Sequence, residues 1–365
     1  MKPLSNIKIL DFTRVLSGPY CTAMLADIGA NVIKIEPPQG DDYRHIGPFL
    51  DDGSSSLFET VNRGKRSAVL DLAKEADRAV ALRLAAEADV VVENFRPGVA
   101  AKLSIGYEAL SIINPKLIYA SISGFGQTGT MAQRPAYDII LQAMSGIMSV
   151  TGEPDRPPTL IGESVADVVS GLFASWAIMA ALNQRHVTGL GQHLDVSMLS
   201  SMLALQPLVS ARFFASGDTP GRVGNRHPIS APFGAFKARD GMFMLAVLND
   251  KLMKALAAVI DEPAIISDPL FATDELRFKN ESALRAYIEN WSGQRNAKDV
   301  VELLMAVGVP AAEVLDAKQA NALVGNTRPQ SQPVLFSGVV NDQLAPAPKL
   351  DEHGTSIREH SWNTI

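Results

Sequence analysis

Ile7-Lys-Ile-Leu10 opens the stretch that decides the fold, which continues through Asp11-Phe-Thr-Arg-Val-Leu-Ser-Gly-Pro19 and closes with Asn31-Val-Ile-Lys-Ile-Glu36. Its two β-rich runs enclose a segment that starts at Pro19 and stops at Gly29. Proline is common at the start of a helix and glycine just past its end, so this segment is predicted to be helical. Two strands joined by one helix form a parallel βαβ unit.

The same alternation continues along the chain. Strands are expected at 67–72, 89–93 and 116–122, helices at 75–86 and 107–113, and a further strand at 193–196. Such alternation is typical of an α/β fold with a doubly wound parallel sheet and helices on both faces. Ligands of these sheets bind at the carboxyl ends of the strands. Three loops are expected there: Arg14 to Gly18, Asn94 to Gly98 and Gly124 to Gly129.

A second, smaller unit is expected after a change in composition between Ser216 and Gly224. Asp240-Gly241 is the turn signal of a hairpin, and helices are expected at 251–260, 281–291 and 297–307. Residues 332–340 are a candidate for one last strand. The expected division is a large domain of residues 1–200 and 325–365, a linker over 201–224, and a small α+β domain over 225–324.

Composition narrows the functional classes. The 365 residues carry a net charge of −6, which argues against a nucleic-acid partner. Cys21 is the single cysteine, and no histidine spacing matches a metal site, so we expect no disulfide and no metal. The N-terminus lacks the apolar core of a signal peptide, and the longest apolar run, Gly171 to Leu182, is too short to span a bilayer. These features predict a cytoplasmic protein without a membrane partner.

A carboxylate is expected near the start of the longest apolar segment. Ile161-Gly-Glu-Ser-Val-Ala-Asp167 leads into the apolar run, which predicts a helix start with Ser164 as its cap. Asp167 then lies in the first turn, where the helix dipole and free backbone N–H groups favour an ionised carboxylate. The helix position alone is equally consistent with an ordinary first-turn aspartate.

Two further patterns leave alternatives. Gly124-Phe-Gly-Gln-Thr-Gly129 has dinucleotide-fingerprint spacing, but more loop follows it instead of a helix, so a mobile flap near the ligand is the better interpretation. Arg63, Lys65 and Arg66 precede a strand, where they form either a solvated face or a phosphate site.

Several motifs in one order carry a resemblance to a known family. They are Asp11–Pro19, Gly29–Glu36, Asn62–Ser67, Val92–Gly98, Ser121–Gly126, Arg134–Asp138, Gln142–Gly146, Gly189–Val196 and Gly224–Pro228. This pattern resembles the class III coenzyme A transferases, the family of carnitine CoA-transferase, the bile-acid-CoA enzymes, formyl-CoA transferase and α-methylacyl-CoA racemase. Pro37 and Ala73 depart from the formyl-CoA transferase pattern, so formate is not assumed as a substrate.

The resemblance implies a Rossmann-like large domain made from both chain ends, a smaller inserted α+β domain, and a homodimer whose two chains interlock. It implies that Asp167 is the catalytic aspartate. It also implies that the CoA part of an acyl-CoA substrate lies against Leu16, Ser17, Leu70, Asn94, Phe95, Arg96, Lys102, Pro135, Ala136, Tyr137 and Asp138.

The implied activity is the transfer of coenzyme A from an acyl-CoA thioester to a carboxylic acid through an aspartyl-CoA intermediate on Asp167. No tightly bound cofactor is expected, because backbone N–H groups can hold the oxyanions. The alternatives are the racemase of the same family and a non-catalytic acyl-CoA-binding protein. The racemase would use a histidine where this chain has Tyr137, and tyrosine is a poor base at neutral pH.

Overall fold

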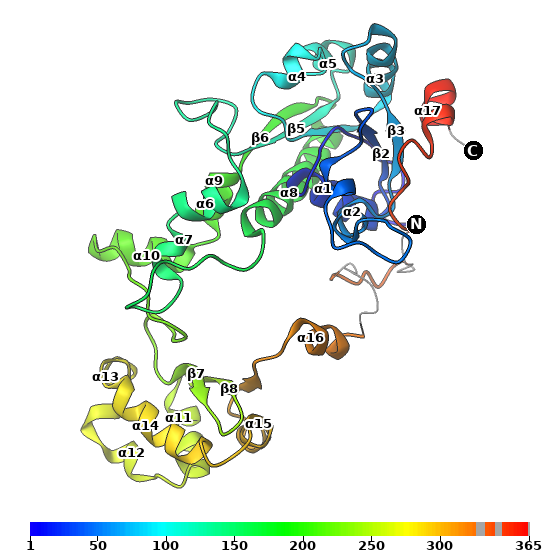
Figure 1. The fold of residues 1–365 in the computed structure, drawn as a ribbon. Coiled ribbons are helices and arrows are strands. Elements are labelled where there is room, and N and C mark those ends of the chain that lie inside the picture. Colours follow the sequence, from blue (N-terminus) through cyan, green and yellow to red (C-terminus); the bar gives the residue numbers. More distant parts are fainter. Residues whose placement is uncertain (326–332, 340–344, 364–365) are drawn as a thin grey trace. The chain divides into compact units, whose positions relative to one another are not determined.

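The computed structural model describes residues 1–325, 333–339 and 345–363, which divide into two compact units. Unit 1 comprises Met1–Met148, Leu160–Thr219 and Arg328–Ile365, and unit 2 comprises Ser149–Thr159 and Pro220–Thr327. The chain therefore leaves unit 1 and returns to it twice, as the colours of the ribbon show (Figure 1).

Unit 1 is built on a six-stranded parallel sheet in the order β3-β2-β1-β4-β5-β6. Leu10 of β1 lies opposite Ile33 of β2 on one side and Val91 of β4 on the other. This order reverses between β1 and β4, as in doubly wound sheets, and confirms the predicted α/β class. The strands are β1 (Lys8–Asp11), β2 (Asn31–Glu36), β3 (Arg66–Val69), β4 (Val90–Glu93), β5 (Ile118–Ser123) and β6 (Gln192–Ser197).

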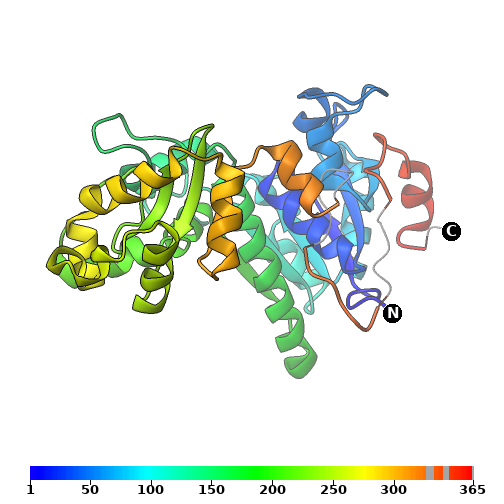
Figure 2. The same ribbon diagram turned by 90° about the horizontal axis from the view of Figure 1, so that it is seen from below.

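Helices cover both faces of this sheet, because successive strand side chains point to opposite faces. Ile9 and Val90 pack in a core with α1 (Ser17–Asp27), α8 (Val165–Thr188) and α9 (Met198–Ala204). Leu10 and Val91 pack on the other face with α3 (Glu75–Glu87), α5 (Tyr107–Ile113) and α17 (Gly354–His360). The long α8 runs alongside α1 (Figure 2).

Shorter helices occupy the connections. They are η1 (Asp42–His45), α2 (Ser56–Asn62), α4 (Val99–Lys102), α6 (Asp138–Met144), α7 (Ile147–Val150) and α10 (Pro207–Ser216). The stretch 201–224, expected as a linker, thus contains α10 and the end of α9.

The C-terminal segment is attached to the β3 edge of the sheet. Asp351 Oδ1 accepts a hydrogen bond from Val69 N at 2.7 Å, and Arg358 donates to Val69 O at 3.2 Å. Trp362 is buried and donates from Nε1 to Leu84 O at 3.0 Å. The expectation of a last strand at 332–340 is wrong for the described part, since 333–339 form turns and irregular chain; 332 and 340 lie outside the described residues.

Unit 2 is an α+β unit with its own core. The predicted hairpin is confirmed by the antiparallel pair β7 (Phe233–Lys237) and β8 (Met242–Ala246), and β9 (Ala311–Glu313) pairs with β8. Its helical segments are α11 (Asp250–Val259), α12 (Ala264–Ser267), η2 (Pro269–Phe271), α13 (Asp274–Lys279), α14 (Glu281–Ser292), α15 (Ala297–Ala306) and α16 (Ala317–Leu323).

Helix α8 is longer than the apolar run of the sequence indicated. Its 24 residues are long and apolar enough to cross a membrane by length and composition, so the expectation that this segment is too short is wrong. The core helix of a globular unit meets the same criterion, and Ala174 and Ile178 of α8 are fully buried in the core of unit 1. Within the described part of the chain, α9 and α10 meet the criterion only as a pair bent by 74°.

Candidate active site

The loops that follow β1 and β4 meet where the strand order reverses. Asn94 Oδ1 accepts from Arg14 N at 2.9 Å, and Asn94 Nδ2 donates to Arg14 O at 2.8 Å. The same Nδ2 donates to Ser17 Oγ at 3.3 Å. Two predicted site residues, Ser17 and Asn94, are therefore in direct contact at the position where doubly wound sheets bind their ligands.

The start of α8 is held by α6. Asp138 Oδ1 accepts from Ala166 N at 2.7 Å, and Asp138 Oδ2 accepts from Gln142 Nε2 at 2.7 Å. Gln142 Oε1 also accepts from Ile161 N at 2.9 Å, which fixes the approach to the helix. Ser164 occupies the N-cap position, but its side chain makes no capping hydrogen bond to the described residues. The expected N-cap position of Ser164 is confirmed, but the side-chain capping bond is made by the Asp138 carboxylate of another helix.

Asp167 lies in the first turn of α8, beside the first residue of α1. Burial and the negative charge of Asp138 raise the pKa of the Asp167 carboxyl to about 7. Hydrogen bonds from the hydroxyl and the backbone N–H of Ser17 act in the opposite direction and lower this pKa. Burial disfavours the ionised form because it removes water from the carboxylate. A poorly solvated carboxylate that still ionises near neutral pH is a candidate nucleophile or base.

A glycine allows α1 and α8 to approach closely at this point. A Cβ at position 171 would lie 2.6 Å from Ser17 O and 3.1 Å from Tyr20 Cδ1. Gly171 is one turn further along α8 than Asp167. The missing side chain therefore lets the start of α1 pack directly against α8, which brings Ser17 to the Asp167 carboxylate.

Tyr43 of η1 is a site residue that the sequence did not single out. Burial raises the pKa of its phenol to about 12, and the largest of the charge effects comes from Asp167, followed by Asp41. The hydroxyl therefore stays protonated at neutral pH and can donate a hydrogen bond near Asp167. Asp41-Asp-Tyr43 is typical of an exposed loop, so no pattern in the sequence points to this role.

A cavity of about 250 Å³ opens at the carboxyl ends of strands β1 to β4. Its lining includes Phe12, Ile35, Leu70, Leu72, Phe95 and Leu103 as apolar walls, with Arg14, Glu36 and Asp71 among its polar groups. The predicted binding residues Leu70 and Phe95 both contribute to it. Arg96 and Lys102 are exposed and directly adjoin the lining residues Phe95 and Leu103 in the sequence. Leu16 is buried at the start of α1.

The remaining predicted residues, 135–138, lie where the Gly124 loop meets α6. A Cβ at Gly124 would lie 2.3 Å from Ala136 Cβ, so the two segments are in contact. Gln127 N donates to Asp195 Oδ2 at 2.9 Å, which anchors the middle of the 124–129 loop on β6. Pro135 and Tyr137 are exposed, whereas Asp138 is buried.

Two residues of the basic cluster Arg63, Lys65 and Arg66 are buried in ion pairs. At these two positions the cluster forms neither a solvated face nor a phosphate site. Lys65 is fully buried, and its Nζ pairs with Asp11 Oδ2 at 3.0 Å. Arg63 pairs with Asp27 and is mostly buried. Both charges are neutralised inside unit 1, so they do not reach a ligand. No group of three His, Cys, Asp or Glu side chains in the described ranges is placed to hold a metal ion.

A model of one protein family, described as CoA-transferase family III, matches residues 4–353. The chain belongs to CoA-transferase family III. This family III enzyme is 45% identical over 371 residues to the acetyl-CoA:oxalate CoA-transferase of Acetobacter aceti, covering 98% of this chain and 95% of that relative. It is 37% identical to the succinate–glutarate CoA-transferase of Agrobacterium fabrum, over 97% of this chain and 94% of the relative.

A solved structure leads to the same family. The CaiB/BaiF family protein of Brucella suis superposes with a TM-score of 0.87 at 38% identity, covering 99% of both chains. The predicted resemblance is confirmed, and so is the predicted class of reaction: the family III enzyme is an acyl-CoA:carboxylate CoA-transferase.

Proposed function

We propose that Asp167 is the nucleophile of this CoA-transferase and carries coenzyme A as an aspartyl thioester. The observation that supports this most is its position, with the carboxylate in the first turn of α8 and against Ser17 at the start of α1. Few carboxylates combine such burial with a pKa near 7. Glu93 also has a pKa raised to about 7, but its carboxylate accepts from Phe95 N at 2.7 Å and is 3% exposed, so it is not open to a substrate.

The reaction runs in balanced acyl exchanges. The Asp167 carboxylate attacks the carbonyl carbon of the donor thioester, and the C–S bond breaks to give a mixed anhydride and CoA thiolate. The thiolate then attacks the aspartyl carbonyl, forms aspartyl-CoA and releases the donor acid. The acceptor carboxylate attacks this thioester and expels the thiolate, which takes up the new acyl group and restores Asp167.

Developing oxyanions need hydrogen-bond donors that are already in position. The Ser17 hydroxyl and backbone N–H lie at the Asp167 carboxylate, and the Tyr43 hydroxyl is protonated nearby. The N-terminus of α1 adds the positive end of a helix dipole. These groups require no metal and no tightly bound cofactor.

We further propose that coenzyme A binds along the carboxyl ends of β1, β3 and β4. The cavity walls at Leu70 and Phe95 suit a flat apolar part of the ligand, and the exposed cations Arg96 and Lys102 suit its phosphates. The other residues that we assign to this binding are Leu16, Ser17, Asn94, Pro135, Ala136, Tyr137 and Asp138.

The names of the relatives suggest which carboxylic acids this enzyme exchanges. The names of the two relatives given above contain oxalate, succinate and glutarate, which are small dicarboxylates. We propose that this enzyme also exchanges coenzyme A between a small acyl-CoA and a dicarboxylic acid. We propose, too, that it acts as an interlocked homodimer in the cytoplasm. Exposed apolar side chains on α8 and α10 support the dimer, with Trp176 70% and Phe214 83% exposed in the single chain.

The test compares two carboxamide variants four positions apart. Asp167→Asn should lower exchange from acetyl-CoA or succinyl-CoA to oxalate or glutarate by about 10⁴-fold or more, because the nucleophile is removed. Glu163→Gln is the matched control, since Glu163 is exposed and its Oε1 accepts a local hydrogen bond from Ser164 N at 2.7 Å. It should keep near wild-type activity. An Asp167→Asn enzyme with more than a few per cent of the wild-type rate would contradict the assignment.

A further inference from the structure

A buried aspartate, Asp41, connects two segments that flank the proposed nucleophile. We infer that Asp41 is a positioning residue, which holds the loop Thr13–Ser17 and the start of η1 in place around Asp167. The inference rests on the proposed role of Asp167 as the carrier of coenzyme A. Asp41 also lines the cavity proposed for coenzyme A, but its carboxylate oxygens face protein groups, so we assign it a role through Ser17 and Tyr43.

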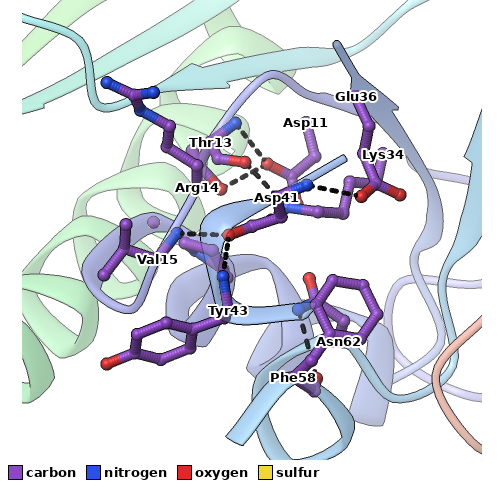
Figure 3. A network of polar contacts seen from close by, with 12 residues as sticks. Asp11, Thr13, Arg14, Val15, Lys34, Glu36, Asp41, Tyr43, Phe58 and Asn62 are labelled. Atoms are coloured by element: carbon purple, nitrogen blue, oxygen red, sulfur yellow. Dashed lines mark hydrogen bonds and ion pairs between the residues drawn. The ribbon is translucent and has the colours of Figure 1, made fainter. Parts of the chain in front are cut away.

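Both oxygens of the Asp41 carboxylate lie close to nitrogen atoms of other residues (Figure 3). Its Oδ1 accepts from Val15 N at 3.0 Å and from Tyr43 N at 3.0 Å, so one atom joins the β1 loop to η1. Its Oδ2 pairs with Lys34 Nζ at 2.8 Å, and both side chains are almost completely buried. These three contacts of the carboxylate are all with N–H or ammonium groups.

The β1 loop needs such an anchor because its backbone is strained. Val15 has φ of 68°, in the left-handed region that a β-branched residue rarely adopts. Such a conformation persists only when the surrounding structure imposes it. The hydrogen bond from Val15 N to Asp41 is one of the contacts that impose it.

Two buried lysines hold the start of this loop and the first turn of α1. Lys34 Nζ donates to Thr13 O at 2.7 Å, and Lys65 Nζ donates to Pro19 O at 3.0 Å. A buried ammonium needs a paired carboxylate, which Asp41 supplies to Lys34 and Asp11 to Lys65. Loss of the Asp41 charge therefore weakens the contact of Lys34 at the start of the loop as well as the direct bond to Val15.

The anchored loop ends at Ser17, which lies against Asp167. On its other side the loop is held by Asn94 through Arg14, as described above. When the Asp41 side of this support is removed, Ser17 and Tyr43 shift relative to the Asp167 carboxylate. Misplacement of about 1 Å at a reacting centre can cost about 10²-fold in rate.

Asp41→Asn is the direct test, because asparagine has the same shape but one oxygen and one NH₂ group. Whichever way the amide turns, its NH₂ faces donors, either Lys34 or the two backbone N–H groups. We expect kcat for the fastest wild-type pair of substrates to fall by about 10²-fold, with little change in KM for the acyl-CoA. Asp89→Asn is the control, since Asp89 pairs with Arg185 at 2.8 Å before β4, at the opposite end of the sheet. It should leave kcat unchanged.

A second variant keeps the inference testable if Asp41→Asn does not fold. Lys34→Met combined with Asp41→Asn removes both charges together, which avoids an unpaired buried ion, and should show the same loss of kcat. Adding Val15→Gly to either variant should restore part of the lost kcat, because glycine adopts a positive φ without support. A purely structural role of Asp41 gives no such recovery.

The outcomes separate this inference from the proposed nucleophile. Wild-type kcat in a folded Asp41→Asn protein, a loss confined to KM, or no recovery with Val15→Gly would each overturn the role of Asp41. Borohydride treatment of the wild-type enzyme with acyl-CoA tests Asp167 separately. If the wild-type enzyme carries no thioester on Asp167, the nucleophile is wrongly assigned, whatever the Asp41 variants show.

Discussion

The contact of Gly171 with α1 allows a substitution whose effect can be worked out from distances. In Gly171→Ala, the new Cβ would lie 2.6 Å from Ser17 O, 3.1 Å from Tyr20 Cδ1 and 3.4 Å from Cys21 N. Real Cβ contacts essentially never fall below 3.0 Å, and ordinary contacts begin at 3.4 Å. The Ser17 carbonyl belongs to the backbone and cannot rotate away, so the start of α1 must move from α8 by about 0.4–0.8 Å.

This shift should lower kcat while the enzyme stays folded. Overpacking costs about 1–3 kcal/mol, but alanine in a helix is favoured over glycine by about 0.5–1 kcal/mol, so the net loss of unfolding free energy is at most about 2.5 kcal/mol. Because Ser17 moves relative to Asp167, kcat should fall by about 10-fold to 10²-fold. A folded variant with a reduced kcat therefore separates the effect on catalysis from the effect on the fold.

Steady-state exchange and urea unfolding should be measured on the same preparations. Gly162→Ala is the matched control, because Gly162 also lies near the start of α8 and a Cβ there meets nothing within 4 Å among the described residues. It should keep wild-type kcat. If Gly171→Ala also keeps wild-type kcat, the close packing of α1 on α8 does not set the position of Ser17, and the reasoning fails.

Three further predictions follow from burial and charge. Because burial and Asp138 raise the pKa of Asp167 to about 7, kcat should rise from about pH 5 to about pH 8 as the nucleophile ionises, and a flat profile would contradict this. Burial also raises the pKa of Glu93 to about 7, so the folded state keeps a proton that the unfolded chain has released, and stability falls as pH rises from 4.5 to 7. Glu93→Gln should therefore raise the urea-unfolding free energy at about pH 8 by up to about 3 kcal/mol, and an equal gain at about pH 4 would refute the cause. Trp362→Ala should cost about 3–5 kcal/mol of unfolding free energy, because Trp362 is buried on the sheet core; a cost below about 1 kcal/mol would show that the C-terminal segment is not part of the fold.

The parallel sheet could be predicted because each strand and helix is marked by residues within or directly beside it in the sequence. Strand β4 is a short, mostly apolar run, as expected for a strand buried on both faces, and proline and glycine mark the ends of α1. The predicted strand at 31–36 is confirmed residue for residue. Helix α2 was not predicted, because its cap, Ser55, lies in a serine-rich stretch that is typical of a loop.

The family motifs indicated Asp167 as the catalytic residue, but not the contacts that support it. The bond from Ala166 N to Asp138 joins residues 28 positions apart, and the bond from Val15 N to Asp41 joins residues 26 apart. Neither pairing leaves a periodic signal in one sequence. Lys65 was misjudged for the same reason: a lysine is buried when a partner such as Asp11 neutralises it, and that partner lies 54 positions away.

The most direct test of the central claim is to trap coenzyme A on Asp167. Enzyme mixed with acyl-CoA, without an acceptor acid, should hold an aspartyl thioester, which borohydride reduces to an alcohol while sparing free carboxylates. Peptide mass spectrometry should then find homoserine at position 167, a loss of about 14 Da that requires acyl-CoA and is absent in Asp167→Asn. Exchange that proceeds while Asp167 stays unmodified, or label on Asp138 or Glu163 instead, would contradict the assignment of Asp167 as the carrier.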